Sequence, residues 1–223
     1  MKNKFICGMI GFLIGCGPNR DFEDKNVFGS QTVGSTSSVT SSSSSTGGSK
    51  QTWPQENSGY KTGQVLPDWL LWKGYPEGIT DESGLTNLPV SSWYDPIGSN
   101  GINAILFLTS KYNCSACAKE SDELSVRVQE WNKNKKGIKV VILLINNQAN
   151  GKPDYASGIQ WKSQYGLNDV TVGIDFAVTF ATSSTFSTPV HTIVDPRTMK
   201  IIDTEEGYSG DYTVLEGLAD ANK

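Results

Sequence analysis

Two apolar runs stand out in the second half of the chain. Residues 103–109 read Asn-Ala-Ile-Leu-Phe-Leu-Thr, and residues 138–145 form a second, mainly aliphatic run. Runs of this length without strict hydrophobic alternation are typical of strands buried on both faces of a sheet. We therefore predict that these two segments are neighbouring central strands.

Apolar residues also recur at helical spacing after each of these runs. Leu124, Val128 and Trp131 form a stripe along one face of a predicted helix. Two further helices are predicted, over residues 154–166 and over residues 211–220.

Shorter apolar segments complete the pattern. Residues 170–176, 192–194 and 199–203 have the length and alternation of strands, and residues 195–198 (Asp-Pro-Arg-Thr) form a turn between the last two. Strands that alternate with helices predict an α/β sheet.

The N-terminus has the pattern of an export signal. Lys2 and Lys4 precede an apolar stretch over residues 5–14, which is too short to span a bilayer. The stretch closes on Leu-Ile-Gly-Cys at residues 13–16, which resembles the lipobox of bacterial lipoproteins. That resemblance implies cleavage before Cys16 and attachment of lipid to its sulfur.

A segment of extreme composition follows. Residues 30–50 contain ten Ser, four Thr and three Gly, and no core can be built from them. We expect a signal peptide over residues 1–15, a lipid-anchored flexible linker over 16–59, and one folded domain over 60–223.

Charge and composition exclude one class of function. The 223-residue chain has a formal net charge of −4 and 37% hydrophobic residues. Binding to nucleic acid needs a clustered basic surface, and we find none beyond Lys133, Lys135 and Lys136 at the end of a predicted helix. No nucleic-acid partner is expected.

The cysteine count points to redox chemistry. Cys7 would leave with the signal peptide and Cys16 would carry lipid, so the mature protein keeps only Cys114 and Cys117. A tetrahedral metal site would need two more ligands, and the chain has one histidine, His191. A C-x-x-C pair on its own favours a redox dithiol over a metal site, and no cofactor is expected.

The position of the pair suggests how it would react. It follows the first apolar run, with Asn113 as a suitable N-cap and Cys114 in the first turn of the helix. Free backbone N–H groups and the helix dipole stabilise a thiolate there, and the thiolate is the attacking species. Cys117, one turn later, would resolve the mixed disulfide.

Three motifs together resemble the thioredoxin-like fold, specifically the TlpA/ResA-like and AhpC/TSA-related exported redoxins. Residues 63–69 resemble the family's N-terminal Gly followed by Pro-Asp-aromatic, and residues 114–120 resemble its Cys-x-x-Cys-x-x-Glu. Thr188-Pro189, followed by an apolar strand and Asp195, resembles its cis-proline loop. The resemblance extends from about Gly63 to the last residue, and it implies a central mixed sheet flanked by helices.

The resemblance also implies roles for individual residues. Cys114 would be the exposed nucleophile and Cys117 the buried resolving thiol. Pro189 would be cis and face the dithiol, while Thr188 would offer backbone hydrogen bonds to a bound substrate. Glu120 would be the glutamate that tunes the thiols; a solvated helix carboxylate is the equally simple alternative.

The chain departs from that family at the dithiol itself. Asn113 stands where the family usually has Trp, and Ser115 and Ala116 replace the familiar Pro-containing pair. Because these positions influence the redox potential, the direction of electron flow stays open.

These features predict a thiol-disulfide oxidoreductase that acts on exported client proteins with thiols or disulfides. Its other partners would be an upstream membrane thiol donor or acceptor and the membrane itself, through the lipid on Cys16. The expected location is the bacterial cell envelope, facing the periplasm. Gly17, rather than Asp, after Cys16 slightly favours the outer over the inner membrane.

Two other chemistries on the same fold are alternatives. A peroxiredoxin-like antioxidant would need Thr three residues before its reactive cysteine, where this chain has Lys111, although Arg197 is available as the arginine. A Sco-like copper chaperone would bind metal through Cys114, Cys117 and His191, since soft thiolates and imidazole suit copper. A third possibility is a non-catalytic lipoprotein that has only inherited the fold.

Overall fold

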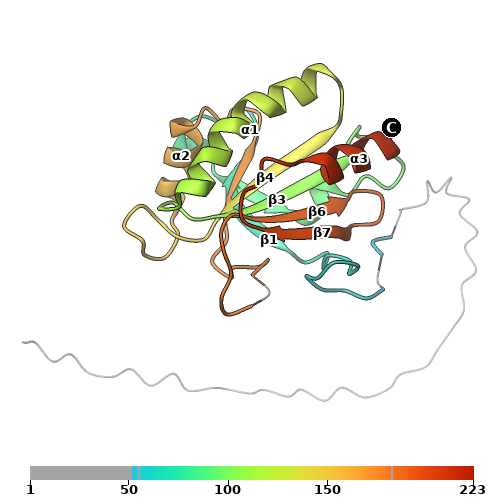
Figure 1. Ribbon diagram of the computed structural model, residues 1–223, viewed down its shortest axis with the longest axis horizontal. Coiled ribbons are helices and arrows are strands. Elements are labelled where there is room, and N and C mark those ends of the chain that lie inside the picture. Colours follow the sequence, from blue (N-terminus) through green and yellow to red (C-terminus); the bar gives the residue numbers. More distant parts are fainter. Residues whose placement is uncertain (1–51, 55, 182) are drawn as a thin grey trace, which may run out of the picture. The chain divides into compact units, whose positions relative to one another are not determined.

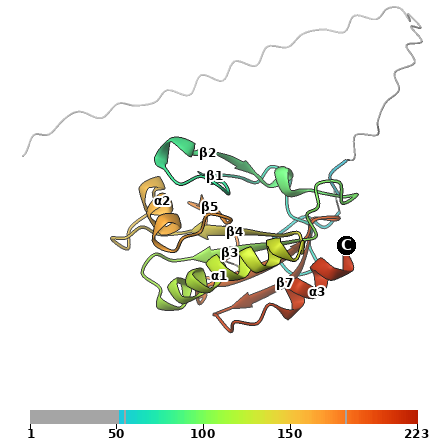
Figure 2. The same ribbon diagram turned by 90° about the horizontal axis from the view of Figure 1, so that it is seen from above.

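A seven-stranded mixed sheet forms the centre of the computed structural model, which describes residues 52–54, 56–181 and 183–223. The signal peptide, Cys16 and most of the linker expected from the sequence lie outside the described residues. The strands lie in the order β2-β1-β5-β4-β3-β6-β7, which Figure 2 shows from above. Their bounds are Leu71–Tyr75 (β1), Thr86–Pro89 (β2), Ala104–Ser110 (β3), Ile138–Leu144 (β4), Thr171–Ile174 (β5), Val190–Asp195 (β6) and Lys200–Glu206 (β7).

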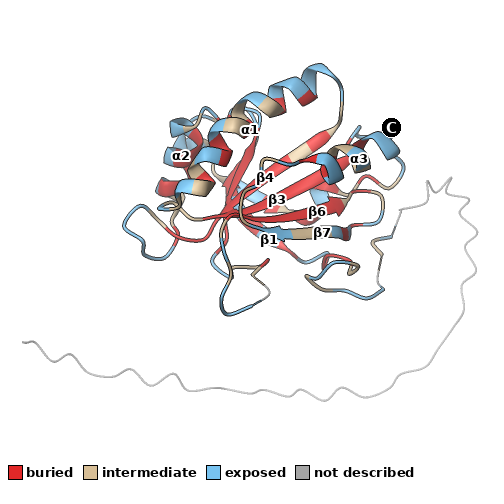
Figure 3. Cartoon of the chain, in the orientation of Figure 1, coloured by how far each residue is buried: buried red, intermediate tan, exposed pale blue. Residues whose placement is uncertain are grey.

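The two predicted central strands are confirmed as β3 and β4. They pair in parallel, and almost every residue in them is buried (Figure 3). β5 continues the parallel set beside β4, whereas β6 and β7 run antiparallel on the other side of β3. The expected mixed sheet is therefore present, and the carboxyl ends of β3, β4 and β5 meet at one edge.

Three helices lie on the same side of this sheet (Figure 1): α1 (Ser115–Lys133), α2 (Tyr155–Gln164) and α3 (Thr213–Ala221). Side chains alternate between the faces of β3, so its residues divide between two apolar clusters. The cluster under the helices includes Leu106, Leu108, Leu124, Ile142 and Trp161. The opposite cluster includes Trp72, Ile105, Phe107, Val141 and Phe180.

Two of the predicted helices have a local cause. α1 buries the stripe Leu124, Val128 and Trp131 against the sheet, as its spacing indicated. α2 begins after Asp154, whose side chain accepts a hydrogen bond from the backbone N–H of Ser157 at 2.7 Å. Such an N-cap satisfies one of the free donors at the start of a helix.

β1 and β2 were not predicted. β1 contains Gly74 and β2 ends on Pro89, two residue types that weaken a strand pattern. They are strands because β1 pairs with β5 on one side and with β2 on the other. Two short 3-10 helices, Glu82–Gly84 and Val90–Trp93, flank β2.

The chain before Tyr60 contributes to the domain where it is described. The indole N–H of Trp53 donates to the carbonyl oxygen of Leu66 at 2.9 Å, and its ring packs against the cluster on the face opposite the helices. Within the described residues, no helix is long and apolar enough to span a bilayer.

Candidate active site

The dithiol lies at the start of α1, where β3 ends. Cys114 is itself the N-cap of the helix: its Sγ accepts the backbone N–H of Cys117 at 3.1 Å. The prediction that Asn113 would be the N-cap is wrong, because the Asn113 side-chain amide instead donates to the carbonyl oxygen of Gln148 at 3.0 Å. A sulfur in the capping position faces the free N–H groups of the first turn, which favours its thiolate.

Cys114 and Cys117 form a disulfide, with their Cα atoms 5.2 Å apart. Cys117 is fully buried in the cluster under the helices, while Cys114 is half-buried. Only the sulfur of Cys114 is therefore open to a partner from solution. This asymmetry matches the exposed and buried thiols that the sequence resemblance implied.

The Thr188–Pro189 segment lies against the dithiol. Its peptide bond is cis, as expected, and Pro189 is buried. The carbonyl oxygen of Thr188 lies 3.4 Å from the Sγ of Cys114. The pairing of Val190 with Thr109 brings this loop to the end of β3, where the dithiol begins.

Behind the dithiol, Glu120 is part of a buried polar cluster. Its side chain is 0% exposed, and its Oε1 accepts a hydrogen bond from the hydroxyl of Tyr212 at 2.8 Å. The same oxygen lies 2.6 Å from the Nε2 of His191, which is also buried. Burial raises the pKa of Tyr212 above its ordinary value, and the neighbouring Glu120 raises it further. This tyrosine therefore stays a neutral donor. The alternative of a solvated carboxylate at Glu120 is wrong.

Tyr212 is the functional candidate that sequence reasoning missed. It lies 92 residues after Glu120 and precedes the short helix α3, so no local pattern links the two. The burial of Glu120 did have a signal, because the residue falls in the apolar stripe between Cys117 and Leu124.

His191 is committed to Glu120 rather than to a set of metal ligands. In the parts of the chain that the structure describes, no group of three or more His, Cys, Asp or Glu residues is arranged to hold a metal ion. The copper alternative through Cys114, Cys117 and His191 therefore finds no ligand set in this geometry.

Arg197 lies away from the dithiol, in the turn between β6 and β7. β6 begins beside the dithiol and ends at Asp195, so this turn is at the opposite edge of the sheet. The Arg197 guanidinium donates to the carbonyl oxygens of Asp95, at 2.6 Å, and Ile102, at 2.7 Å. It joins loops at that edge, so the peroxiredoxin alternative loses its arginine as well as its threonine.

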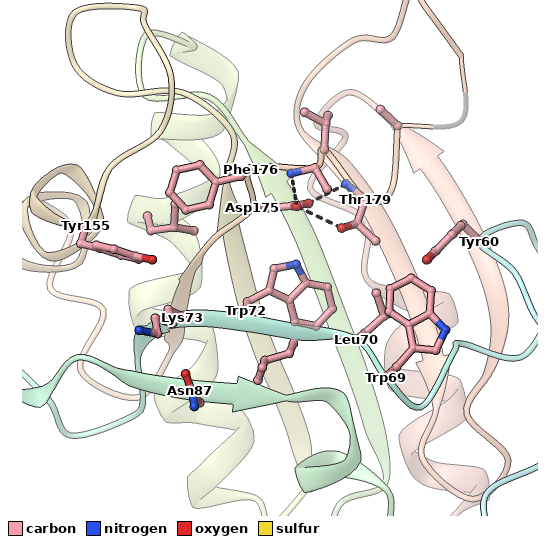
Figure 4. Close-up of a pocket in the computed structure, with 15 residues that line it drawn as sticks. Tyr60, Trp69, Leu70, Trp72, Lys73, Asn87, Tyr155, Asp175, Phe176 and Thr179 are labelled. Atoms are coloured by element: carbon pink, nitrogen blue, oxygen red, sulfur yellow. Dashed lines mark hydrogen bonds between the residues drawn. The ribbon is translucent and has the colours of Figure 1, made fainter. Parts of the chain in front are cut away.

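A cavity of about 560 Å³, the aromatic cavity, lies at the end of β5 and beside β1 (Figure 4). Five aromatic side chains line it: Tyr60, Trp69, Trp72, Tyr155 and Phe176. Its buried carboxylate, Asp175, accepts hydrogen bonds from the backbone N–H groups of Ala177 and Thr179, at 3.1 and 2.6 Å. The hydroxyl of Thr179 donates a third, at 3.0 Å, so Asp175 closes its own loop.

Comparison with known proteins identifies the fold. No protein-family model matches the sequence, and no curated protein matches it. Among solved structures, a candidate protein disulfide isomerase from Bacteroides thetaiotaomicron matches with a TM-score of 0.51 and 13% identity, covering 73% of this chain and 89% of that chain. The fold is thus thioredoxin-like, as the sequence predicted.

Two further solved structures are similar at lower scores. The thioredoxin domain of a thiol-disulfide oxidoreductase from Bacteroides vulgatus matches with a TM-score of 0.49 and 17% identity, covering 71% of this chain and 98% of that chain. A candidate thiol:disulfide interchange protein DsbE from Chlorobium tepidum matches with a TM-score of 0.48 and 16% identity, covering 73% of this chain and 97% of that chain.

Proposed function

We propose that this chain is a thiol-disulfide oxidoreductase that exchanges disulfides with client proteins through Cys114 and Cys117. One observation carries the proposal: the sulfur of the half-buried Cys114 caps α1 and lies 3.4 Å from the Thr188 carbonyl oxygen, beside the cis Pro189. The helix start favours the thiolate, and the loop offers a backbone acceptor beside it.

The exchange needs only the two sulfurs and the client. To reduce a client disulfide, the Cys114 thiolate attacks one client sulfur, and the client's other sulfur leaves as a thiolate. Cys117 then attacks the Cys114 sulfur, which breaks the mixed disulfide and releases the second client thiol. The reverse sequence oxidises a client dithiol, and Ser115 and Ala116 between the cysteines help to set which direction prevails.

Several parts of the proposal concern the cellular setting. The lipobox-like residues 13–16 support a lipid anchor on Cys16 and a place in the bacterial cell envelope, facing the periplasm. Exported proteins with thiols or disulfides would then be the clients, and a membrane thiol donor or acceptor would recharge the pair. The motifs at 63–69, 114–120 and 188–195 support a relationship with the TlpA/ResA-like redoxins.

Trapping of mixed disulfides tests the exchange. In Cys117→Ser, attack by Cys114 still occurs but resolution fails, so covalent complexes with clients should accumulate and disappear on addition of reductant. They are measured on non-reducing gels of cell-envelope extracts, with mass spectrometry of the captured proteins.

Cys114→Ser is the matched control. It keeps a cysteine one turn further along the same helix, but that cysteine is buried, so it should trap little. Equal trapping by both variants would show that burial does not decide which of the two thiols attacks the client first. No trapping by either variant would contradict the proposed function.

A further inference from the structure

Glu120, three residues after Cys117 on α1, has one oxygen with hydrogen-bonding neighbours and one without. Its Oε1 receives the Tyr212 hydroxyl and faces the Nε2 of His191, whereas its Oε2 is buried without a hydrogen-bond partner among the described residues. Glu120 follows Cys117 by three residues on α1, so both side chains lie on the same buried face of the helix. A buried acceptor of this kind is costly unless a donor reaches it at some stage.

His191 connects this cluster to the surface. Its Nδ1 lies 4.0 Å from the Oε2 of Glu205 on β7, a side chain that is 50% exposed. A cavity of about 50 Å³ lies at the same place, bordered by both residues and by Tyr212. This volume is enough for water to enter. One imidazole nitrogen therefore faces the buried carboxyl group, and the other faces the side open to solvent.

The other charged groups around the cluster come from α1, from β7, and from α3 and the residues just before it: Glu123, Arg127, Asp203, Asp211 and Glu216. Arg127 is the cation among them, and its guanidinium lies over the Tyr212 ring at 4.9 Å while pairing with Glu123 at 2.8 Å. Its ion-pair partners are Glu123 and Glu216. Histidine is the residue type that changes charge near neutral pH, so His191 is suited to balance the charge of Glu120.

We propose that His191 exchanges a proton with solvent whenever Glu120 exchanges one with the Cys117 thiol, and so links the charge at that thiol to the β7 side of the molecule. This inference rests on the dithiol exchange proposed above. His191 acts through Glu120 and is therefore a positioning residue, while Glu120 is the group that meets the thiol.

The resolving step then balances as follows. In the mixed disulfide, the Cys117 thiol gives its proton to Glu120 Oε2, and its sulfur forms a bond to Cys114. The bond between Cys114 and the client breaks, and its electron pair leaves on the client sulfur, which takes a proton from solvent. As Glu120 becomes neutral, the His191 imidazolium releases its Nδ1 proton to solvent.

Throughout this step the Nε2–H of His191 keeps donating to Oε1. The buried pair changes from carboxylate and imidazolium to carboxylic acid and imidazole, so its net charge is zero before and after. This avoids leaving an uncompensated charge in the interior, which is strongly unfavourable. Reduction of the disulfide by the recharging partner reverses the transfers and restores the starting state.

NMR of the wild-type protein gives the most direct test. His191 is the chain's one histidine, so its imidazole signals need no assignment. Titrated between about pH 5 and 8, the imidazole should stay protonated to higher pH when dithiothreitol has reduced the pair than when it is oxidised. Identical titration curves in the two states would overturn the inference.

The matched variants are His191→Gln and Tyr212→Phe. Gln places an N–H near the position of Nε2 but cannot carry a proton, so resolution of a mixed disulfide should slow by about 10²-fold, the lower end of what positioned proton transfer contributes. The rate should also lose its dependence on pH near neutrality. Tyr212→Phe removes one hydrogen bond and should change the rate by the same factor at every pH.

Each outcome has a defined meaning. A His191→Gln protein that is folded by circular dichroism and keeps the wild-type pH profile would overturn the inference. A redox-dependent His191 signal in a wild-type protein that exchanges disulfides with no client would support the proton link and contradict the proposed function. The NMR arm needs no variant and no client, so it decides the inference even where a substitution prevents folding.

Discussion

Asp175 and Glu120, two carboxyl groups buried beside aromatic rings in the described part of the chain, differ in how their oxygens are hydrogen-bonded. At the aromatic cavity, Asp175 accepts three hydrogen bonds from its own loop, through Ala177 and Thr179. Behind the dithiol, Glu120 receives both its partners on Oε1, and its Oε2 has none within the described chain. Asp175 is supplied by residues two and four positions away, whereas Glu120 is supplied from β6 and from the start of α3.

This difference separates a structural carboxylate from one available for chemistry. A fully hydrogen-bonded carboxylate fixes the backbone that surrounds it and has little capacity left for a new partner. A carboxylate with a free, buried oxygen can accept a proton from a neighbour. The aromatic cavity is the larger of the two cavities, but its carboxylate, Asp175, is the one without a free oxygen.

The largest expected effect on the rate of disulfide exchange comes from removing the carboxylate of Glu120. Glu120→Gln should slow the resolution of a mixed disulfide by about 10²-fold, because the amide cannot accept the Cys117 proton. Its carbonyl oxygen can still accept from Tyr212, but its amide NH2 replaces the unpartnered Oε2, so we expect the unfolding free energy to fall by about 1–3 kcal/mol. Stopped-flow measurement of resolution, with urea unfolding in parallel, checks both. An unchanged rate would show that Glu120, like Asp175, has only a structural role.

The converse pattern is expected at the aromatic cavity. Asp175→Asn turns one buried acceptor into a donor that meets the N–H groups of its own loop, at a cost of about 2 kcal/mol. For a domain of this size, the melting temperature should fall by roughly 4–8 °C. Disulfide exchange by the folded variant should match the wild type, and a loss of exchange at temperatures where it is folded would contradict the separation.

A third buried carboxylate, Asp95, sharpens the comparison through its pH dependence. Burial opposes its ionisation, but hydrogen bonds from Asn100 and Ile102 and the nearby Arg197 outweigh it and hold the pKa of Asp95 below 3.8. Burial raises the pKa of Asp175 above the same value, against its hydrogen bonds. The two carboxylates should therefore affect stability with opposite slopes.

The sign follows from linkage. The stabilisation from Asp95 is present above pH 3.8 and is lost as the pH falls through its folded pKa, whereas that from Asp175 is greatest below pH 3.8 and declines as the pH rises through its folded pKa. Urea unfolding of the wild type, Asp95→Asn and Asp175→Asn between about pH 3 and 7 measures both slopes. If the unfolding free energies of the two variants changed with pH in the same way, the two carboxylates would not have pKa values shifted in opposite directions.

The smallest effect is expected on the rim of the cavity. Phe176 is 60% exposed, so Phe176→Ala should change the unfolding free energy by less than about 1 kcal/mol. The rate of disulfide exchange with a client identified by the trapping experiment should stay within about two-fold of the wild type. A large rise in KM would instead place the cavity within the client-binding surface.

Much of the fold could be predicted because it is encoded locally. The apolar run in β3 and the stripe of α1 depend only on neighbours in sequence, and each was found within a few residues of its observed bounds. β1 was not found, since Leu71–Tyr75 is short and contains Gly74, and its identity as a strand depends on pairing with distant residues.

The candidate site divides in the same way. The cysteine pair and Thr188-Pro189 are readable motifs, and the structure brings them together. The contact between Glu120 and His191 joins residues 71 positions apart, and it requires the register that places His191 opposite Leu108. Whether Asn113 or Cys114 caps α1 depended on a side-chain hydrogen bond to Gln148, which no local pattern reports.

A redox titration of the Cys114–Cys117 couple, with thiol trapping of each state, tests the central claim most directly. The account predicts a reversible two-electron couple with a midpoint between about −120 and −270 mV, the range of known dithiol oxidoreductases. A midpoint below about −300 mV, which is typical of structural disulfides, would contradict it.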